Sequence, residues 1–162
     1  SSKNIVCGNT LVNVKGNITA RRGDDNVIIS NYLEGSKIGV EGRGQKVIGN
    51  MLMGGSIDVL AGDRSSDGED STKVKGCEEG KHPSAEGALL ADNTATVSIG
   101  HTFSKTEKCY TFPAKDITVE GNDGDVSYDK AHFQGPKHEG GSKQEPHRAA
   151  EKLTKEDVGP RG

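Results

Sequence analysis

Tryptophan is absent from the 162-residue chain, and aromatic residues make up only 4% of it. Hydrophobic residues reach 30%, so we expect a core of small and branched aliphatic side chains, as a thin coil requires. No stretch holds the 18 or so consecutive apolar residues of a transmembrane helix, and no membrane span is predicted. The net charge of −3 gives no reason to expect general affinity for nucleic acid.

Cysteine is scarce, with three residues and no Cys-x-x-Cys pair that would indicate a zinc site. Cys7 lies beside apolar residues of a predicted strand, which favours a buried free thiol. Cys77 and Cys109 fall in loop-like segments and could form a disulfide in a secreted protein. The histidines are scattered and are interpreted as solvated loop residues; they are His82, His101, His132, His138 and His147.

Helical periodicity is missing too, and a β-rich repeat takes its place. Residues 4–62 hold three near-copies of one unit, in which apolar residues are followed by Asn and later by Gly. The repeated asparagines Asn9, Asn31 and Asn50 are 22 and 19 residues apart. A period of about 20 residues is typical of a solenoid. Hairpins in a sandwich are the alternative, but no Asn-Gly or Asp-Gly turn joins strands in this stretch.

The local pattern favours a coil with one face turned inward. Residues 37–41 alternate so that every second side chain points to the same side. Frequent glycines supply the positive-φ corners that each coil needs. An Asn at the same place in successive coils predicts a ladder in which each side chain bonds the backbone of a neighbouring coil.

These patterns predict one all-β domain, a parallel β-helix over residues 1–133. A long polar loop is expected at 63–87, with the coils resuming at Ala88, and an irregular tail at 134–162 that includes a short helical turn at 149–153. A solenoid needs a cap at each end, and nothing before Asn4 could form one. We therefore expect an uncapped N-terminal end, in a fragment, a processed product, or a chain whose first coil another protein chain covers.

The order of motifs resembles the polysaccharide lyases of the family 6 type, which include chondroitinase B and alginate lyases. The matching elements are Gly8-Asn9-Thr10, the turn Arg21-Arg22-Gly23-Asp24, Asn31-Tyr32, and the later coils that end in Asn93-Thr94 and Gly121-Asn122. The resemblance covers most of residues 4–122, and its most specific part is the arginine turn in register with the coils.

This resemblance implies a right-handed parallel β-helix that cleaves uronate polysaccharides by β-elimination outside the cell or in the periplasm. In the family a lysine removes the proton next to the uronate carboxylate, and calcium neutralises that carboxylate. Arg21 matches the family's catalytic arginine, whose fixed charge and forked donors suit a carboxylate. Arg22, Asp24 and Arg43 are assigned to binding of the anionic polysaccharide.

The sequence also departs from the family pattern. Arg22 stands where the family has a histidine, and Gly39 stands where relatives often have an arginine. In this register the catalytic lysine would fall just before Ser1 and the calcium ligands earlier still, so neither is expected in this chain. The sequence therefore predicts the C-terminal portion of a uronate lyase without turnover of its own. The alternatives are a non-catalytic β-helix that binds glycans or builds an extracellular assembly, and a trimeric fibre of the phage type.

Overall fold

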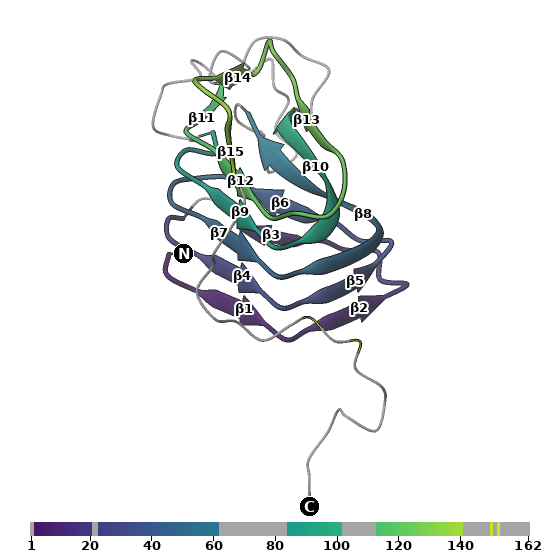
Figure 1. Cartoon of the computed structure of the whole chain (residues 1–162). Coiled ribbons are helices and arrows are strands. Elements are labelled where there is room, and N and C mark those ends of the chain that lie inside the picture. Colours follow the sequence, from purple (N-terminus) through teal and green to yellow (C-terminus); the bar gives the residue numbers. More distant parts are fainter. Residues whose placement is uncertain are drawn as a thin grey trace, which may run out of the picture.

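The computed structural model describes residues 2–20, 23–61, 84–101 and 113–140, together with Ala150 and Lys152. These residues form fifteen short strands, and no helix is found among them. Consequently, none of the described segments is a helix long and apolar enough to cross a membrane. The strands stack in successive coils along one axis (Figure 1).

One side of the stack is a six-stranded parallel sheet, here sheet A. Its strands follow in the spatial order β1 (Ile5–Cys7), β4 (Val27–Ile29), β7 (Lys46–Ile48), β9 (Leu89–Ala91), β12 (Thr118–Glu120) and β15 (His138–Gly140). Each pair is in register without a shift, as in Val6↔Ile28 and Ile28↔Val47. Each coil therefore adds one strand to this sheet, at the same position within the coil, which is the defining feature of a solenoid.

The other side, sheet B, holds β2 (Thr10–Val12), β3 (Ile18–Ala20), β5 (Tyr32–Glu34), β6 (Ile38–Val40), β8 (Met51–Leu60), β10 (Thr94–His101) and β13 (Val126–Tyr128). The ten-residue strand β8 pairs with β5 through its first half and with β6 through its second half. Two short strands per coil thus merge into one long strand in the third and fourth coils, as β8 and β10, whereas β13 of the next coil has three residues. A small third sheet pairs β11 (Ala114–Lys115) with β14 (Phe133–Gln134).

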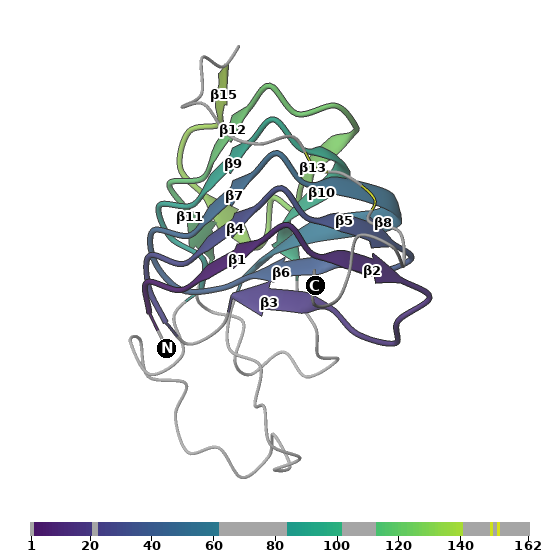
Figure 2. The ribbon, with the colours of Figure 1, turned by 90° about the horizontal axis from the view of Figure 1, so that it is seen from below.

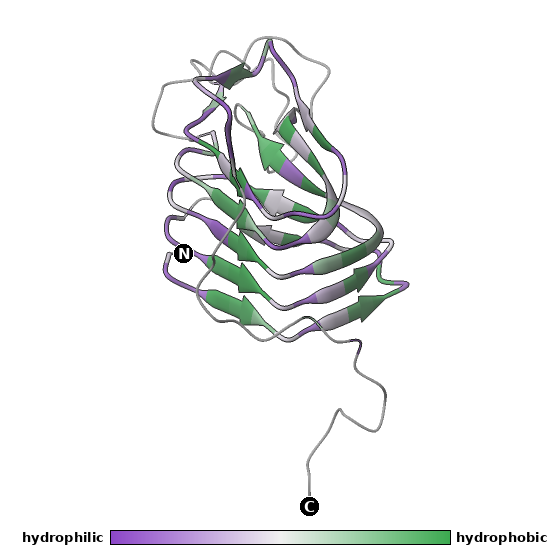
Figure 3. Cartoon of the chain, in the orientation of Figure 1, coloured by the Kyte–Doolittle hydropathy of each residue, from purple (hydrophilic) through white to green (hydrophobic). Residues whose placement is uncertain are grey.

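The core is a column of aliphatic side chains between the sheets. Figure 3, which colours the ribbon by hydropathy, shows that the strands carry most of the hydrophobic residues. Leu33, Ile38, Val47, Ile57 and Leu90 are fully buried. Small residues such as Ala85 and Ala88 fill the corners of the coil. The prediction of an all-β parallel β-helix with a core of small and branched aliphatic side chains is confirmed.

The predicted asparagine ladder is present and runs through five coils. The main-chain N–H and the Nδ2 of each Asn donate to Oδ1 of the Asn in the next coil, in the order Asn9, Asn31, Asn50, Asn93 and Asn122. From the second coil on, Nδ2 also reaches a main-chain carbonyl of the preceding coil, at 2.9–3.0 Å. A second, shorter ladder joins Asn4, Asn26 and Gln45 at the opposite end of sheet A.

Several boundaries and environments differ from the expectations. Cys7 is exposed, because it faces outward on β1, so the prediction of a buried thiol is wrong. The coils resume at Ser84, where Ser84 and Ala85 are already buried. Strand β15 lies within the segment for which an irregular tail was predicted. Most of the predicted polar loop, Cys77 and Cys109 lie outside the described residues, as do residues 149, 151 and 153 of the predicted helical turn.

Candidate functional site

The turn Gly23–Asp25, which follows β3 and leads into β4, is fixed on both sides by main-chain and side-chain hydrogen bonds. Asp24 Oδ1 accepts the Arg43 N–H at 3.0 Å, and the Asp25 N–H donates to the Arg43 carbonyl at 2.9 Å. Gln45 Nε2 donates to the Gly23 carbonyl. The turn is thus stacked on the corresponding turn of the next coil, and it holds the predicted site residues Asp24 and Arg43 next to each other.

Arg43 begins a charged row that climbs the same corner of the coil. Residues Arg43, Glu86 and Lys115 pair as isolated parallel bridges between successive coils. Arg43 Nε lies 3.5 Å from Glu86 Oε2, and Lys115 Nζ lies 3.5 Å from Glu86 Oε1. The Arg43 side chain remains 64% exposed. In this row Arg43 and Lys115 flank one carboxylate, and the adjoining turn adds the carboxylates of Asp24 and Asp25, so the exposed Arg43 guanidinium is the group of this corner that an anionic polymer could contact.

The arginine pair of the same turn, Arg21 and Arg22, lies outside the described residues. The two residues are joined to Ala20, which ends β3, and to Gly23, which begins the fixed turn. Their attachment points are therefore part of the rigid coil.

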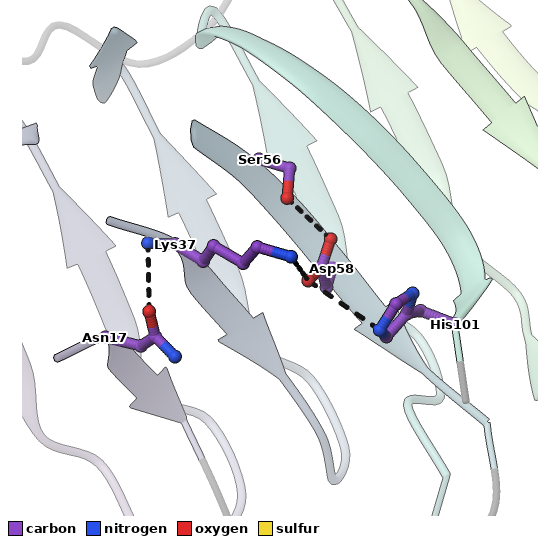
Figure 4. Close-up of polar contacts among 5 residues, drawn as sticks. All are labelled: Asn17, Lys37, Ser56, Asp58 and His101. Carbon is purple, nitrogen blue, oxygen red and sulfur yellow. Dashed lines mark hydrogen bonds and ion pairs between the residues drawn. The ribbon is translucent and has the colours of Figure 1, made fainter. Parts of the chain in front are cut away.

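A second polar cluster occupies the outer face of sheet B (Figure 4). Asp58 on β8 is its centre, and its side chain is only 4% exposed. Ser56 Oγ donates to Asp58 Oδ1 at 2.8 Å, and Lys37 Nζ donates to Oδ2 at 3.3 Å. His101 Nε2 lies 3.9 Å from the same Oδ2. Burying a carboxylate is costly unless it is paired and hydrogen-bonded, and these partners supply that compensation.

The cluster is also tied to the coil below. The main-chain N–H of Lys37 donates to Asn17 Oδ1 at 3.1 Å, which fixes the start of β6 against the residue before β3. Gly39 lies in register between Thr19 and Asp58. Since Gly39 carries no side chain, Lys37 can extend diagonally across it to Asp58 on the next strand. Diagonal neighbours on one sheet face are within reach of long side chains.

Two further clusters lie elsewhere on the surface. The Tyr32 hydroxyl donates to Glu34 Oε1 at 2.7 Å, and Lys152 Nζ lies 2.7 Å from the same oxygen. The hydrogen bond from Lys152, followed by that from Tyr32, lowers the pKa of Glu34. Asp129 accepts hydrogen bonds from His132 Nδ1 at 2.9 Å and from the Ala131 N–H at 3.0 Å. The first of these contributes most to lowering the pKa of Asp129.

The expectation of solvated loop histidines is therefore wrong for His101, which ends β10 and faces Asp58. His132 lies in a turn and contacts Asp129, while His138 is exposed on β15. His82 and His147 are outside the described residues. Asp58 was not singled out from the sequence, although its position as the one charged residue in the apolar stretch Ile57–Ala61 could have indicated it. No sequence signal showed that Lys37 and His101 converge on it.

The described residues do not fit the calcium site of the family that the sequence resembles. Among them, no three histidine, cysteine, aspartate or glutamate side chains cluster closely enough to hold a metal ion. Of the acidic residues in the fixed turn, Asp24 already uses Oδ1 to accept a main-chain N–H. No chemical step is therefore derived through a metal.

The fold defines the class: this chain is a parallel β-helix. Comparison with known proteins adds no closer assignment, because no protein family, no curated protein and no solved structure matches the chain. The stacked sheets and the in-register coils thus establish the architecture, and the function has to be argued from the surface.

Proposed function

We propose that this chain is part of a β-helical uronate polysaccharide lyase and that it binds an anionic polysaccharide along the corner next to the Gly23–Asp25 turn. The observation that carries the proposal is the stacking of that turn on Arg43. The hydrogen bonds to Asp24 and Asp25 hold the main chain of Arg43 in place, next to the turn whose sequence carries the arginine pair. A cation whose main chain is already fixed binds an anion with less ordering of the site.

The chemistry that this supports is recognition of a uronate carboxylate. In β-elimination a base removes the proton on the carbon next to the carboxylate, and the glycosidic oxygen leaves from the adjacent carbon. Negative charge then develops on the carboxylate, so a nearby arginine stabilises the intermediate. Arg21 is assigned this part, while Arg22 and Arg43 bind the neighbouring acidic sugars. We assign no base, and the proposal predicts binding and not turnover by this chain alone.

Affinity electrophoresis tests the proposal. Wild-type protein should be retarded in a gel that contains polygalacturonate or alginate and should run normally in a gel that contains a neutral glucan. Arg21→Ala and Arg43→Ala should each restore much of the mobility, since a charge-assisted hydrogen bond contributes about 1.5–3 kcal/mol. Lys130→Ala, in an exposed turn after β13, removes one charge elsewhere and is the control. Equal mobility of the wild type in both gels would refute the proposal.

A second function is favoured by the first coil. Among the described residues, no strand pairs with the outer edges of β1, β2 and β3, the strands coloured purple in Figure 2. Ile5 is 71% and Val14 48% exposed there. An open cavity of about 260 Å³, lined by Val6, Ile18 and Ile28 among others, leads to the core. These features suit a structural β-helix in an extracellular assembly whose first coil is covered by another protein chain, and sedimentation as a complex would distinguish it.

A further inference from the structure

The side chain of His101 faces outward because of a β-bulge. Along β10, Val97 and Ile99 point into the core and pair in register with Ile57 and Val59. Strict alternation would send residue 101 to the same side. The register shifts after Ile99, so that His101 pairs with Leu60 and Gly100 is the extra residue. A bulge of this kind re-aims the next side chain, and bulges are frequent next to binding sites.

Gly100 is suited to this bulge for two reasons. Its φ of +87° lies in the left-handed region, which side chains other than hydrogen disfavour. A Cβ at this position would also lie 3.0 Å from the carbonyl oxygen of His132. The bulge thus needs glycine, and its result is that an imidazole lies on the outer face beside Asp58.

In this cluster the negatively charged side chain is buried, whereas the lysine and the histidine are partly exposed. Asp58 is covered, whereas Lys37 is 50% and His101 31% exposed. A ligand that approaches this face therefore meets an ammonium group and an imidazole edge, while the carboxylate lies beneath them. An ammonium group has three donors, and Asp58 receives one of them from Lys37. The arrangement favours an anionic ligand over a neutral or cationic one.

The cluster also lies in line with the proposed polysaccharide site. Thr19 on β3, Gly39 on β6 and Asp58 on β8 occupy one row of the sheet. Neighbouring strands are about 4.8 Å apart, so β3 and β8 are separated by about 10 Å. A polysaccharide chain that crosses the strands from the end of β3 would reach Asp58 within a few sugar units.

We propose that Lys37, Asp58 and His101 form a subsite for the carboxylate of one uronate unit, in addition to the arginine turn. The inference rests on the proposed function. Lys37 and His101 contact the sugar carboxylate. Asp58 is a positioning residue, which accepts a hydrogen bond from Lys37 Nζ and lies 3.9 Å from His101 Nε2.

Isothermal titration calorimetry with a mannuronate hexamer, and with neutral mannohexaose as the comparison sugar, tests this subsite. Lys37→Met and His101→Gln should each weaken binding of the acidic hexamer about tenfold, the effect of losing one charge-assisted contact. Lys37→Arg should retain most of the affinity. Matched controls are Lys46→Met and His138→Gln, which alter exposed residues of sheet A and should bind like the wild type. Thermal melting would confirm that each variant is folded.

The outcomes separate the two proposals. If Arg43→Ala weakens binding while Lys37→Met and His101→Gln bind like the wild type, the subsite is refuted and the proposed function stands. If the wild type binds neither sugar, both are refuted. If neutral mannohexaose bound as tightly as the mannuronate hexamer, the proposal that this cluster recognises the sugar carboxylate would be contradicted. Asp58→Asn tests positioning: in NMR spectra of the imidazole nitrogens, the hexamer should shift the His101 signals in the wild type and much less in the variant.

Discussion

Replacement of Asn50 by alanine should destabilise the β-helix more than almost any other change that removes a single polar side chain. Asn50 is 1% exposed and lies in the middle of the ladder. Its Oδ1 accepts the Asn31 main-chain N–H at 2.9 Å and Asn31 Nδ2 at 3.0 Å. Its Nδ2 donates to Asn93 Oδ1, to the Ile28 carbonyl and to the Ile48 carbonyl.

The magnitude follows from what each partner loses. Asn31 Nδ2 keeps two main-chain acceptors, the carbonyls of Val6 and Ile29. The Asn31 main-chain N–H loses the acceptor shown for it, and leaving a buried donor unsatisfied costs about 1–3 kcal/mol. The remaining lost bonds add about 1 kcal/mol each at most. We therefore expect Asn50→Ala to lower the free energy of unfolding by about 3–5 kcal/mol, a large part of the 5–15 kcal/mol typical of a domain.

Asn9→Ala supplies the matched control at the exposed end of the same ladder. Asn9 Nδ2 donates to Asn31 Oδ1 and to the Cys7 carbonyl, and the Asn9 main-chain N–H keeps its bond to Asn31 Oδ1 after the substitution. No described group donates to Asn9 Oδ1, so the cost should stay near 1 kcal/mol. Urea unfolding followed by circular dichroism measures both variants. Equal losses at the two positions, or a loss below 1 kcal/mol for Asn50→Ala, would refute the ladder as a source of stability.

Two further predictions concern backbone packing and pH. Gly55→Ala should destabilise the protein by at least about 2 kcal/mol in the same assay, because its Cβ would lie 1.9 Å from the Ser36 carbonyl oxygen, whereas Gly16→Ala should be close to neutral. The wild type should be more stable than Asp129→Asn above about pH 4, the ordinary pKa of an aspartate. That difference should shrink as the pH falls through the lowered pKa of folded Asp129. A difference that grows in acid would contradict the assignment.

The repeated Asn and the apolar residues before it were enough to predict the coils, because both features act between neighbouring copies of one unit. A polar side chain that recurs at the same position of each coil can form hydrogen bonds with the equivalent residue of the next coil, as Asn31 does with Asn50. The merging of two short strands into β8 was not predictable in this way. Within β8, Gly55 packs so closely against the Ser36 carbonyl that no side chain would fit there, and no local pattern reports this contact between coils.

The environments of single residues followed less well from the sequence. Cys7 was expected inside because its neighbours are apolar, but a three-residue strand turns alternate residues outward, and only Val6 of β1 packs against the core. Asp24 was chosen as part of the arginine turn, whereas Arg43 was assigned to the site without a motif of its own, and the structure shows why the two lie close together. Their turns stack because each coil repeats the path of the previous one.

His101 illustrates most clearly what a sequence pattern leaves out. If side chains alternated strictly along β10, residue 101 would face the core like Val97 and Ile99, and a histidine would be costly to bury there. The bulge at Gly100 turns the side chain of His101 to the outer face, where the imidazole lies beside the buried carboxylate of Asp58, which also contacts Lys37. Because the contact depends on one residue of register between β8 and β10, it is set by the pairing of residues that are 40–43 positions apart in the chain. A surface that could bind a sugar acid is in this sense a product of the stacked coils, and the residues that form it share no motif.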